Sequence, residues 1–405
     1  MRVAIIGGGA AGLFAGGLLS NSGIIATIFD GNEKLGKKLY ITGKGRCNLT
    51  NDTDVDGYLA NVVHGKKFMY SAINNFTCAD TIKFFENQGL PLKTERGNRV
   101  FPCSDKSSDV IKKLSHYAAG CKINLCEKVL AVTNEKGTFK IKTEKQSYLF
   151  DKVIVATGGK SYPATGSSGD GYKLAASFGH NIVKPCPALV PIKISDSFCS
   201  SLEGLSLKNV TLTAVIAGKK HSLFGEMLFT HDGISGPIAL SLSSFIGREQ
   251  DVKLYIDFKS ALTNEQLHNR LIRDFQDNSN KNLSYIIKGL LPKRLAEAFL
   301  TCCGIDGSIK AGIVSAEQRK IIVEKLKSFE LKFGGLYPIE AGIITSGGVC
   351  TKEINPKTME SKLVSGLYFI GEVLDVDCLT GGFNLQTAFS TAHACAQSII
   401  STKQV

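Results

Sequence analysis

Three glycines near the start of the chain have the spacing that binds the pyrophosphate of a dinucleotide. Gly7, Gly9 and Gly12 form the pattern G-x-G-x-x-G directly after the apolar run Val3–Ile6. In this pattern the first glycine allows a tight turn, the second lets the backbone approach the phosphates, and the third lets a helix pack on a strand. The helix N-terminus then offers free N–H groups and a positive dipole end to the phosphates. The clustered glycines also argue against a secretory signal peptide, whose apolar segment is helical.

An acidic residue follows at the position that this pattern requires. Ile24–Phe29 is predicted to form a second strand, and Asp30 closes it, 18 residues after Gly12. A carboxylate there accepts hydrogen bonds from the ribose hydroxyls of an adenosine. Strand, glycine turn, helix, strand and acid therefore occur in the order of a Rossmann-type nucleotide-binding domain.

Later segments favour FAD over NAD as the dinucleotide. The buried strand 153–156 continues into Thr157 and Gly158, at a place where flavoproteins commonly bring a segment to the cofactor. Gly371 and Glu372 follow a late strand, and Gly381–Asn384 opens the last predicted helix, 384–400. The positive end of such a helix would stabilise the negative charge of reduced flavin.

The hydrophobic pattern between these segments indicates inserted subdomains. Alternating apolar residues over 190–258 are typical of β structure, whereas capping-box signatures at Thr263–Gln266 and Ser315–Gln318 precede helical patterns. We therefore predict an α/β fold: a Rossmann-like FAD-binding domain of the glutathione-reductase type, interrupted by a β-barrel-like and a helical subdomain. The predicted ranges are 1–189 and 340–405 for the FAD-binding domain, 190–262 and 331–339 for the β subdomain, and 263–330 for the helical subdomain.

Composition limits the class of protein. The 405 residues suffice for two or three domains, and no apolar run reaches the roughly 20 residues of a membrane span. The twelve cysteines are scattered, without a CxxC pair or metal-ligand spacing. We therefore expect reduced thiols, a cytoplasmic location and no metal. The net charge of +12 permits an anionic partner without requiring one, and the oligomeric state is left open.

Four stretches resemble the YhiN-like or BaiN-like bacterial flavoproteins, a set of predicted NAD(P)/FAD-dependent oxidoreductases. They are GKKLYITGKGRCNLTN (36–51), ATGGKSYPATGSSGDGY (156–172), GEMLFTHDGISGP (225–237) and GEVLDVDCLTGGFNLQ (371–386). The resemblance implies FAD in an N-terminal domain with inserted subdomains, and a substrate that the family leaves poorly defined. The chain departs from the expected pattern at Lys37, where an arginine would bind phosphate with two hydrogen bonds, at Cys378 in place of glycine, and at Thr391-Ala392 in place of Ser-Gly.

The predicted cofactor-binding residues combine the glycine turn, the late segments and the resemblance, which alone implies the positions from 37 to 48. They are Gly7, Gly9, Ala10, Ala11, Gly12, Asp30, Lys37, Lys38, Thr42, Gly45, Arg46, Cys47, Asn48, Val129, Ala156, Thr157, Gly158, Gly371, Glu372, Gly382, Asn384 and Leu385.

No catalytic acid, base or nucleophile follows from the sequence. For Tyr162 a packing role beside Pro163 competes with a catalytic one, and for His231 we favour a loop histidine that is hydrogen-bonded to backbone. Cys47 is followed by no nearby second thiol, since the next cysteine is Cys78, so a dithiol mechanism is not expected.

The leading functional hypothesis is an FAD-dependent oxidoreductase that transfers a hydride at flavin N5 to or from a small-molecule substrate. NAD(P)H is a possible donor, and it would bind transiently because no second Rossmann motif is present. The alternative is an RNA-acting flavoprotein, as among tRNA-modifying enzymes. Residues 259–332 carry 13 basic and 8 acidic side chains but no aromatic stripe or RNA motif, so we do not expect nucleic acid as a partner. A third option is a flavin-binding protein with a sensing or structural role.

Overall fold

The computed structural model divides the chain into two compact units, each with its own hydrophobic core. It describes residues 1–247, 249 and 251–402. Unit 1 comprises Met1–Ala188 and Pro338–Val405, and unit 2 comprises Leu189–Tyr337. Residues 248 and 250, in the predicted β subdomain, and 403–405, in the predicted FAD-binding domain, lie outside the described residues.

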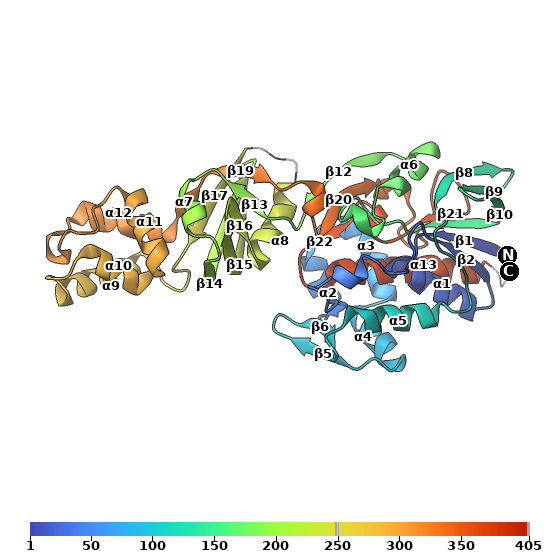
Figure 1. The fold of residues 1–405 in the computed structure, drawn as a ribbon, viewed down its shortest axis with the longest axis horizontal. Helices are drawn as coiled ribbons and strands as arrows, with labels where there is room; N and C mark the ends of the chain where they lie inside the picture. Colours follow the sequence, from blue (N-terminus) through green and yellow to red (C-terminus); the bar gives the residue numbers. More distant parts are fainter. Residues whose placement is uncertain (248, 250, 403–405) are drawn as a thin grey trace. The chain divides into compact units, whose positions relative to one another are not determined.

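A parallel sheet of five strands forms the centre of unit 1, in the order β21-β11-β1-β2-β7 (Figure 1). Its strands are β1 (Arg2–Ile6), β2 (Ile25–Phe29), β7 (Lys122–Asn124), β11 (Lys152–Val155) and β21 (Leu367–Phe369). The central strands are almost continuously apolar because parallel strands are buried on both faces. Helices α1 (Ala10–Asn21) and α13 (Phe383–Ser401), from the two ends of the chain, pack against each other.

Smaller elements surround this sheet. The other strands of unit 1 are β3 (Thr50–Asn51), β4 (Val62–His64), β5 (Leu92–Glu95), β6 (Arg99–Pro102), β8 (Val129–Glu135), β9 (Thr138–Thr143), β10 (Ser147–Phe150), β12 (Ile182–Ala188), β20 (Ile344–Val349) and β22 (Asp377–Cys378). They form the antiparallel sheets β10-β9-β8 and β3-β6-β5 and the pairs β12-β20 and β22-β4. The other helices are α2 (Val55–Ala60), α3 (Lys66–Asn75), α4 (Cys78–Asn87), α5 (Ser107–Tyr117) and α6 (Asp170–Ser177).

Unit 2 contains an antiparallel sheet in the order β18-β17-β14-β15-β16-β13-β19. Its strands are β13 (Ile192–Ile194), β14 (Ser206–Ile216), β15 (Lys219–Thr230), β16 (Gly233–Ser235), β17 (Val252–Asp257), β18 (Phe329–Leu331) and β19 (Phe333–Leu336). Its helices are α7 (Phe198–Ser201), α8 (Pro237–Ile246), α9 (Asn264–Asp277), α10 (Leu283–Leu290), α11 (Lys293–Cys303) and α12 (Ala316–Lys327).

The two capping boxes predicted in unit 2 are present. Thr263 caps α9 and Ser315 caps α12, each with a reciprocal hydrogen bond from the residue three positions on. The strands and helices of unit 2 share one core, and their division into two subdomains stays a prediction.

Two features of the described residues bear on cellular context. No described helix combines the length and the apolar character needed to cross a membrane. All twelve cysteines are free thiols.

Asp170, in the first turn of α6, is expected to make unit 1 sensitive to acid. Burial alone would raise its pKa, but hydrogen bonds from Lys128, Ser168 and Lys173 lower the pKa to about 2, against 3.8 for a free aspartate. Since the folded pKa is the lower one, ionised Asp170 stabilises the folded state by about 2 kcal/mol. This contribution is complete above pH 5 and is lost as the pH falls from about 4 to about 2.

Urea unfolding of Asp170→Asn between pH 7 and pH 3 checks this prediction. The variant should be about 2 kcal/mol less stable than the parental protein at pH 7, and the difference should shrink below pH 4. A difference that does not change with pH would contradict the assignment.

Candidate functional site

The three motif glycines have the three distinct roles that the pattern predicts. Gly7 has a φ of +110°, and a Cβ atom there would lie 2.4 Å from the carbonyl oxygen of Ala156. A Cβ atom on Gly12 would lie 1.9 Å from the Gly7 carbonyl oxygen. A Cβ atom on Gly9, in contrast, would meet nothing within 4 Å. Space is therefore open at the position where a pyrophosphate would approach the backbone, and the residues fit this part of FAD.

The start of α1 suits an anionic group. The helix begins after its N-cap Gly9, which has no side chain to cap it, and its first turn, which includes Ala10 and Ala11, contains no acid. Its first N–H groups are thus not capped by a side chain, and the positive end of the dipole is not offset locally.

Asp30 holds the glycine turn in place. Its carboxylate accepts hydrogen bonds from the backbone N–H of Gly8 at 2.8 Å and from the backbone and side chain of Asn32 at 2.8 and 2.9 Å. A contact from Asp30 to a ribose stays a prediction. Val129, also predicted to line the cofactor, is buried at the start of β8.

Lys38 and Glu372, both predicted at the cofactor, form an ion pair. Lys38 Nζ lies 2.6 Å from Glu372 Oε2, and both side chains are about one-fifth exposed. Glu372 Oε1 also accepts from the Thr345 backbone N–H at 2.9 Å and from Ser161 Oγ at 3.1 Å. Glu372 thereby ties three segments together. Lys37 instead pairs with Glu33 at 3.2 Å.

We expect Glu372→Ala to destabilise unit 1. The substitution removes the acceptor of hydrogen bonds from three residues, Lys38, Ser161 and Thr345, and leaves the largely buried Lys38 ammonium without its carboxylate. The free energy of unfolding should fall by about 2–3 kcal/mol. Glu372→Gln keeps an oxygen for the Thr345 N–H and should cost less. Urea unfolding measures both, and equal losses would show that the hydrogen bond from Thr345 contributes little and that the lost negative charge accounts for the destabilisation.

The loop Thr42–Asn48 lies against the β5–β6 hairpin. Arg46 donates to Asp105 at 2.8 Å and to Glu95, and its guanidinium lies 4.2 Å from the centre of the Phe101 ring. Gly45 accepts from the Ser107 N–H at 2.8 Å, and the Thr42 carbonyl accepts from the Cys47 N–H at 2.9 Å.

Two buried oxygens in the predicted cofactor segments fit a bound ligand. Asn48 Oδ1 and Thr157 Oγ1 have no hydrogen-bond partner among the described residues. Buried polar atoms are usually hydrogen-bonded, so these two atoms are available to a cofactor. Thr157 lies between Ala156, at the glycine turn, and Gly158, whose φ is +71°.

The start of α13 lies next to the strand that follows Asn48. Gly382, the N-cap of α13, has a φ of +99°, and a Cβ atom there would lie 2.3 Å from the carbonyl oxygen of Thr50. Asn384, in the first turn of α13, accepts from the Cys378 N–H at 3.0 Å, and Leu385 packs against the core. Since Asn48 is two residues before Thr50, the structure brings these two predicted segments together.

Gly371 links both helices of the core. Its N–H donates to Thr391 Oγ1 at 3.0 Å, and a Cβ atom on it would lie 3.1 Å from the Cβ of Ala11. Thr391, a departure from the family pattern, thus has a structural role. Cys378, the other departure near α13, is fully buried.

Cys47 does not have the properties of a redox thiol. It is fully buried with a φ of +60°, and burial raises the pKa of its thiol to about 12. The thiolate, which is the reactive form, is therefore absent at neutral pH.

We expect Cys47→Ser to retain bound flavin and the rate of flavin reduction, as measured by anaerobic absorbance. Loss of both a charge-transfer band and reductase activity would show that Cys47 is a redox partner.

A polar cluster in unit 1 was not predicted. His64 Nδ1 lies 2.6 Å from Asp377 Oδ1, and Ser346 Oγ donates to the same oxygen at 2.9 Å. Asp377 is fully buried, whereas 49% of the His64 side chain is exposed. The antiparallel pairing of β4 with β22 places His64 opposite Asp377. The only sequence signal was that Asp377 lies in the stretch 371–386.

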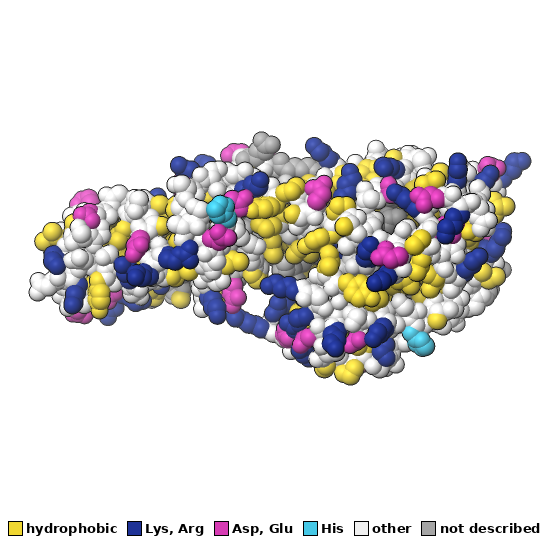
Figure 2. Space-filling view, viewed as in Figure 1, with side chains coloured by type: hydrophobic (Ala, Val, Ile, Leu, Met, Phe, Trp, Pro, Cys, Tyr) yellow, Lys and Arg dark blue, Asp and Glu magenta, His cyan; other side chains and the backbone are white. Residues whose placement is uncertain are grey.

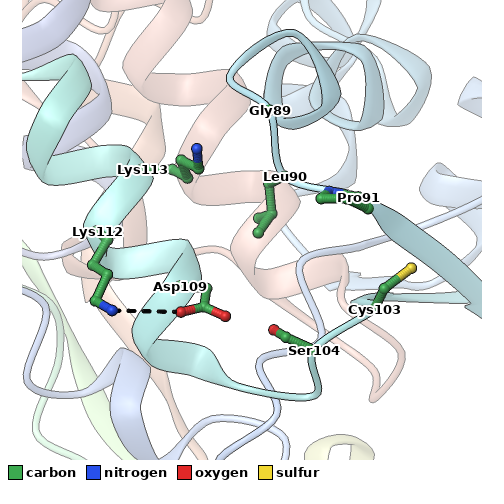
Figure 3. A pocket seen from close by; sticks show the side chains of 8 residues that line it. All are labelled: Gly89, Leu90, Pro91, Cys103, Ser104, Asp109, Lys112 and Lys113. Carbon is green, nitrogen blue, oxygen red and sulfur yellow. Dashed lines mark ion pairs between the residues drawn. The ribbon is translucent and has the colours of Figure 1, made fainter.

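Two further candidates for a functional site are a histidine of unit 2 and a cavity of unit 1. His231, in unit 2, is 75% exposed, and its Nδ1 lies 3.3 Å from the Glu203 carboxylate rather than from the backbone partner that we expected. A cavity of about 280 Å³ in unit 1 contains none of the predicted cofactor residues (Figure 3). It is lined by Gly89, Leu90, Pro91, Cys103, Ser104, Asp109, Lys112 and Lys113.

Comparison with known proteins gives matches along nearly the whole chain. The family described as HI0933-like protein Rossmann domain matches residues 1–398. A ribosomal RNA dihydrouridine synthase of Haemophilus influenzae is 36% identical, covering 98% of this chain and 97% of that protein. One from Escherichia coli is 32% identical, covering 98% of each chain. A 3-dehydro-bile acid delta(4,6)-reductase of Clostridium scindens is 30% identical, again covering 98% of each.

A solved structure shares the fold at low sequence identity. The 3-ketosteroid-delta4-(5alpha)-dehydrogenase from Rhodococcus jostii RHA1 superposes with a TM-score of 0.52 at 13% identity, covering 98% of this chain and 96% of that one. With the family match, this confirms the predicted fold class, an α/β Rossmann FAD-binding fold with inserted antiparallel strands.

The comparisons correct the predicted partners. We expected a small-molecule substrate and did not expect nucleic acid, yet two relatives that match nearly the whole chain are named for action on ribosomal RNA. The prediction failed because it looked for an RNA-binding pattern within one contiguous segment.

The family match over residues 1–398 and the relatives at 30–36% identity agree with the glycine turn, its fit to a pyrophosphate and the motifs at both ends of the chain. The chain belongs to the HI0933-like family of flavin-dependent oxidoreductases, the YhiN-like and BaiN-like flavoproteins that its motifs resemble.

Proposed function

We propose that this protein uses FAD to reduce uridine to dihydrouridine in ribosomal RNA. The observation that carries the proposal is the pair of full-length relatives named ribosomal RNA dihydrouridine synthase. The bile acid relative supports the same reaction type, because its name also describes reduction of carbon–carbon double bonds near a ring carbonyl. The basic character of the chain, +12 overall, suits a polyanionic substrate.

The reaction needs a hydride and a proton. In uracil the C5=C6 double bond is conjugated with the C4 carbonyl, so a hydride adds at C6 and a proton at C5, which saturates the bond. A bound flavin supplies the hydride, and NAD(P)H is the two-electron donor that we propose for it. Gly9, the start of α1, Asn48 and Thr157 are the residues that we propose to hold FAD.

We assign the proton to His64. A half-exposed imidazole that hydrogen-bonds to a buried carboxylate has a fixed orientation and can exchange its proton with solvent. Strand β4, which carries His64, pairs with β22. Strand β22 ends at Cys378, four residues before Gly382, the N-cap of α13. Asp377 and Ser346 act as positioning residues for the ring.

Analysis of modified nucleosides tests the function directly. The purified protein is incubated with FAD, NADPH and unmodified transcripts of bacterial 16S and 23S ribosomal RNA without oxygen, and the digested RNA is analysed by mass spectrometry. We expect dihydrouridine, two hydrogen atoms heavier than uridine, in one of the transcripts, which contain no ribosomal protein. If RNA stays unmodified while the same preparation reduces a 3-oxo-4-ene steroid acid, the proposal is wrong.

A further inference from the structure

We propose that single-stranded RNA docks on a basic surface of unit 1 beside the loop Thr42–Asn48, an inference that rests on the proposed function. We call it the hairpin surface and define it by Tyr40, Lys44, Arg99 and Lys106. Residues 93–113 carry six basic and three acidic side chains, and Lys44 and Arg46 add two more basic ones. Figure 2 shows basic side chains gathered over the β5–β6 end of this unit, with acidic ones among them.

Hydrogen bonds and ring contacts connect the two segments of this surface, although they are distant in the sequence. Ser107, next to Lys106, donates its N–H to the Gly45 carbonyl at 2.8 Å and its hydroxyl to the Tyr40 carbonyl at 3.1 Å. Lys106 therefore lies beside the loop that carries Lys44. The guanidinium of Arg99 lies 5.7 Å from the centre of the Phe101 ring, which Arg46 also contacts at 4.2 Å.

The acids at the centre of this region are already neutralised by other cations. Asp105 pairs with Arg46 at 2.8 Å and with Lys93 at 2.6 Å, and Glu95 pairs with Arg46. Two cations and two carboxylates thus balance each other. Lys44, Arg99 and Lys106 take part in no ion pair within the described part of the chain, so their charge is available to phosphates.

An exposed aromatic ring completes the chemistry. Tyr40 is 41% exposed and Ile41 is 44% exposed, both at the short 3-10 turn Leu39–Ile41 that enters the loop. Unpaired bases stack on exposed aromatic rings, and this contact is independent of sequence. Tyr40 is two residues before Thr42, the first predicted cofactor residue of the loop, so a base stacked on Tyr40 would lie next to that loop.

A hollow is lined in part by Ser104, two residues before Lys106 of the hairpin surface. The cavity of about 280 Å³ includes Ser104, next to Asp105, and Lys112 and Lys113 of α5 (Figure 3). Lys112 pairs with Asp109 at 3.8 Å. A strand of RNA that leaves Lys106 would therefore meet two more lysines.

Charge reversal tests the surface. Arg99→Glu/Lys106→Glu and, as a second pair, Lys44→Glu/Lys106→Glu are compared with Lys140→Glu/Lys142→Glu, two exposed lysines of β9 in the same unit. The probes are a labelled 20-nucleotide oligouridylate and protein-free ribosomal RNA. Both hairpin-surface pairs should bind at least about 10-fold more weakly at low salt, with a salt dependence reduced by about 1.4, because each lost contact to a single strand removes about 0.7 from the slope. The β9 pair should bind as the parental protein does.

Tyr40→Ala tests the stacking contact separately. It should weaken binding about 10-fold without changing the salt dependence, since stacking releases no counterions. Flavin absorbance and the thermal unfolding temperature of each variant show whether it is folded.

The outcomes separate this inference from the proposed function. If the hairpin-surface variants are folded and bind both probes as tightly as the parental protein, the surface proposal is overturned, even if dihydrouridine is formed. If the parental protein binds RNA through this surface but forms no dihydrouridine, the surface is supported and the proposed function fails.

Discussion

Gly9→Leu is expected to give a folded protein that contains no FAD. A Cβ atom on Gly9 meets nothing within 4 Å, so the first atom of a leucine side chain would enter open space. It would instead fill the space beside the start of α1 that we assign to the pyrophosphate. We expect FAD affinity to fall by at least about 100-fold, or about 2.7 kcal/mol, as measured by the flavin absorbance of the purified protein and by titration with FAD.

Gly12→Ala is the matched control. Its Cβ would lie 1.9 Å from the Gly7 carbonyl oxygen, so this smaller substitution should disturb the packing of α1 on the sheet and lower thermal stability. Gly9→Leu should instead unfold at the temperature of the parental protein without FAD. A yellow Gly9→Leu protein that binds FAD normally would show that the pyrophosphate lies elsewhere.

His64→Gln is expected to slow the reduction of RNA by about 100-fold or more, the usual range for loss of a general acid. Glutamine retains a hydrogen bond to Asp377 but cannot deliver a proton. Binding of FAD and its reduction by the donor should be unchanged, because neither step uses this proton. Stopped-flow absorbance measures the rates of the two half-reactions separately. The first is the reduction of flavin by NADPH, and the second is its reoxidation by the ribosomal RNA transcript.

His116→Gln serves as the control for this variant. His116 is exposed in the last turn of α5, and its substitution should leave both half-reactions at their parental rates. If His64→Gln is reoxidised by RNA as fast as the parental protein, another group provides the proton. If both half-reactions slow equally, His64 supports the fold rather than the chemistry.

Several features were predictable from the sequence because short segments encode them. The turn at Gly7, the start of α1 and the capping boxes at Thr263 and Ser315 depend on backbone conformation and hydrogen bonds within a few residues. The strands β1, β2, β11 and β21 and the helices α1 and α13 follow from local hydrophobic patterns in the same way. Together with the resemblance, these local signals were enough to identify the fold class and the FAD motif.

Tertiary structure alone decided which polar side chains meet. Lys38 pairs with Glu372, 334 residues away, and His64 with Asp377, 313 residues away. No sequence spacing predicts either pair, because strand pairing and loop packing bring the two residues of each pair together. Arg46 is similar: the resemblance implied that it lies along the cofactor, whereas the structure pairs it with Glu95 of β5 and with Asp105, which follows β6.

The same reason explains why the sequence weighed against RNA, on which two relatives are named as acting. Charge was judged over the contiguous segment 259–332, where an excess of five basic residues is spread among apolar positions. The hairpin surface combines Tyr40 and Lys44 with Arg99 and Lys106, about 60 residues further along, through hydrogen bonds of Ser107. By itself the sequence determined the cofactor class and the local elements that bind it, since both depend on neighbouring residues. Only the tertiary structure decided which charges neutralise each other, because electrostatic interactions depend on distance in space rather than along the chain.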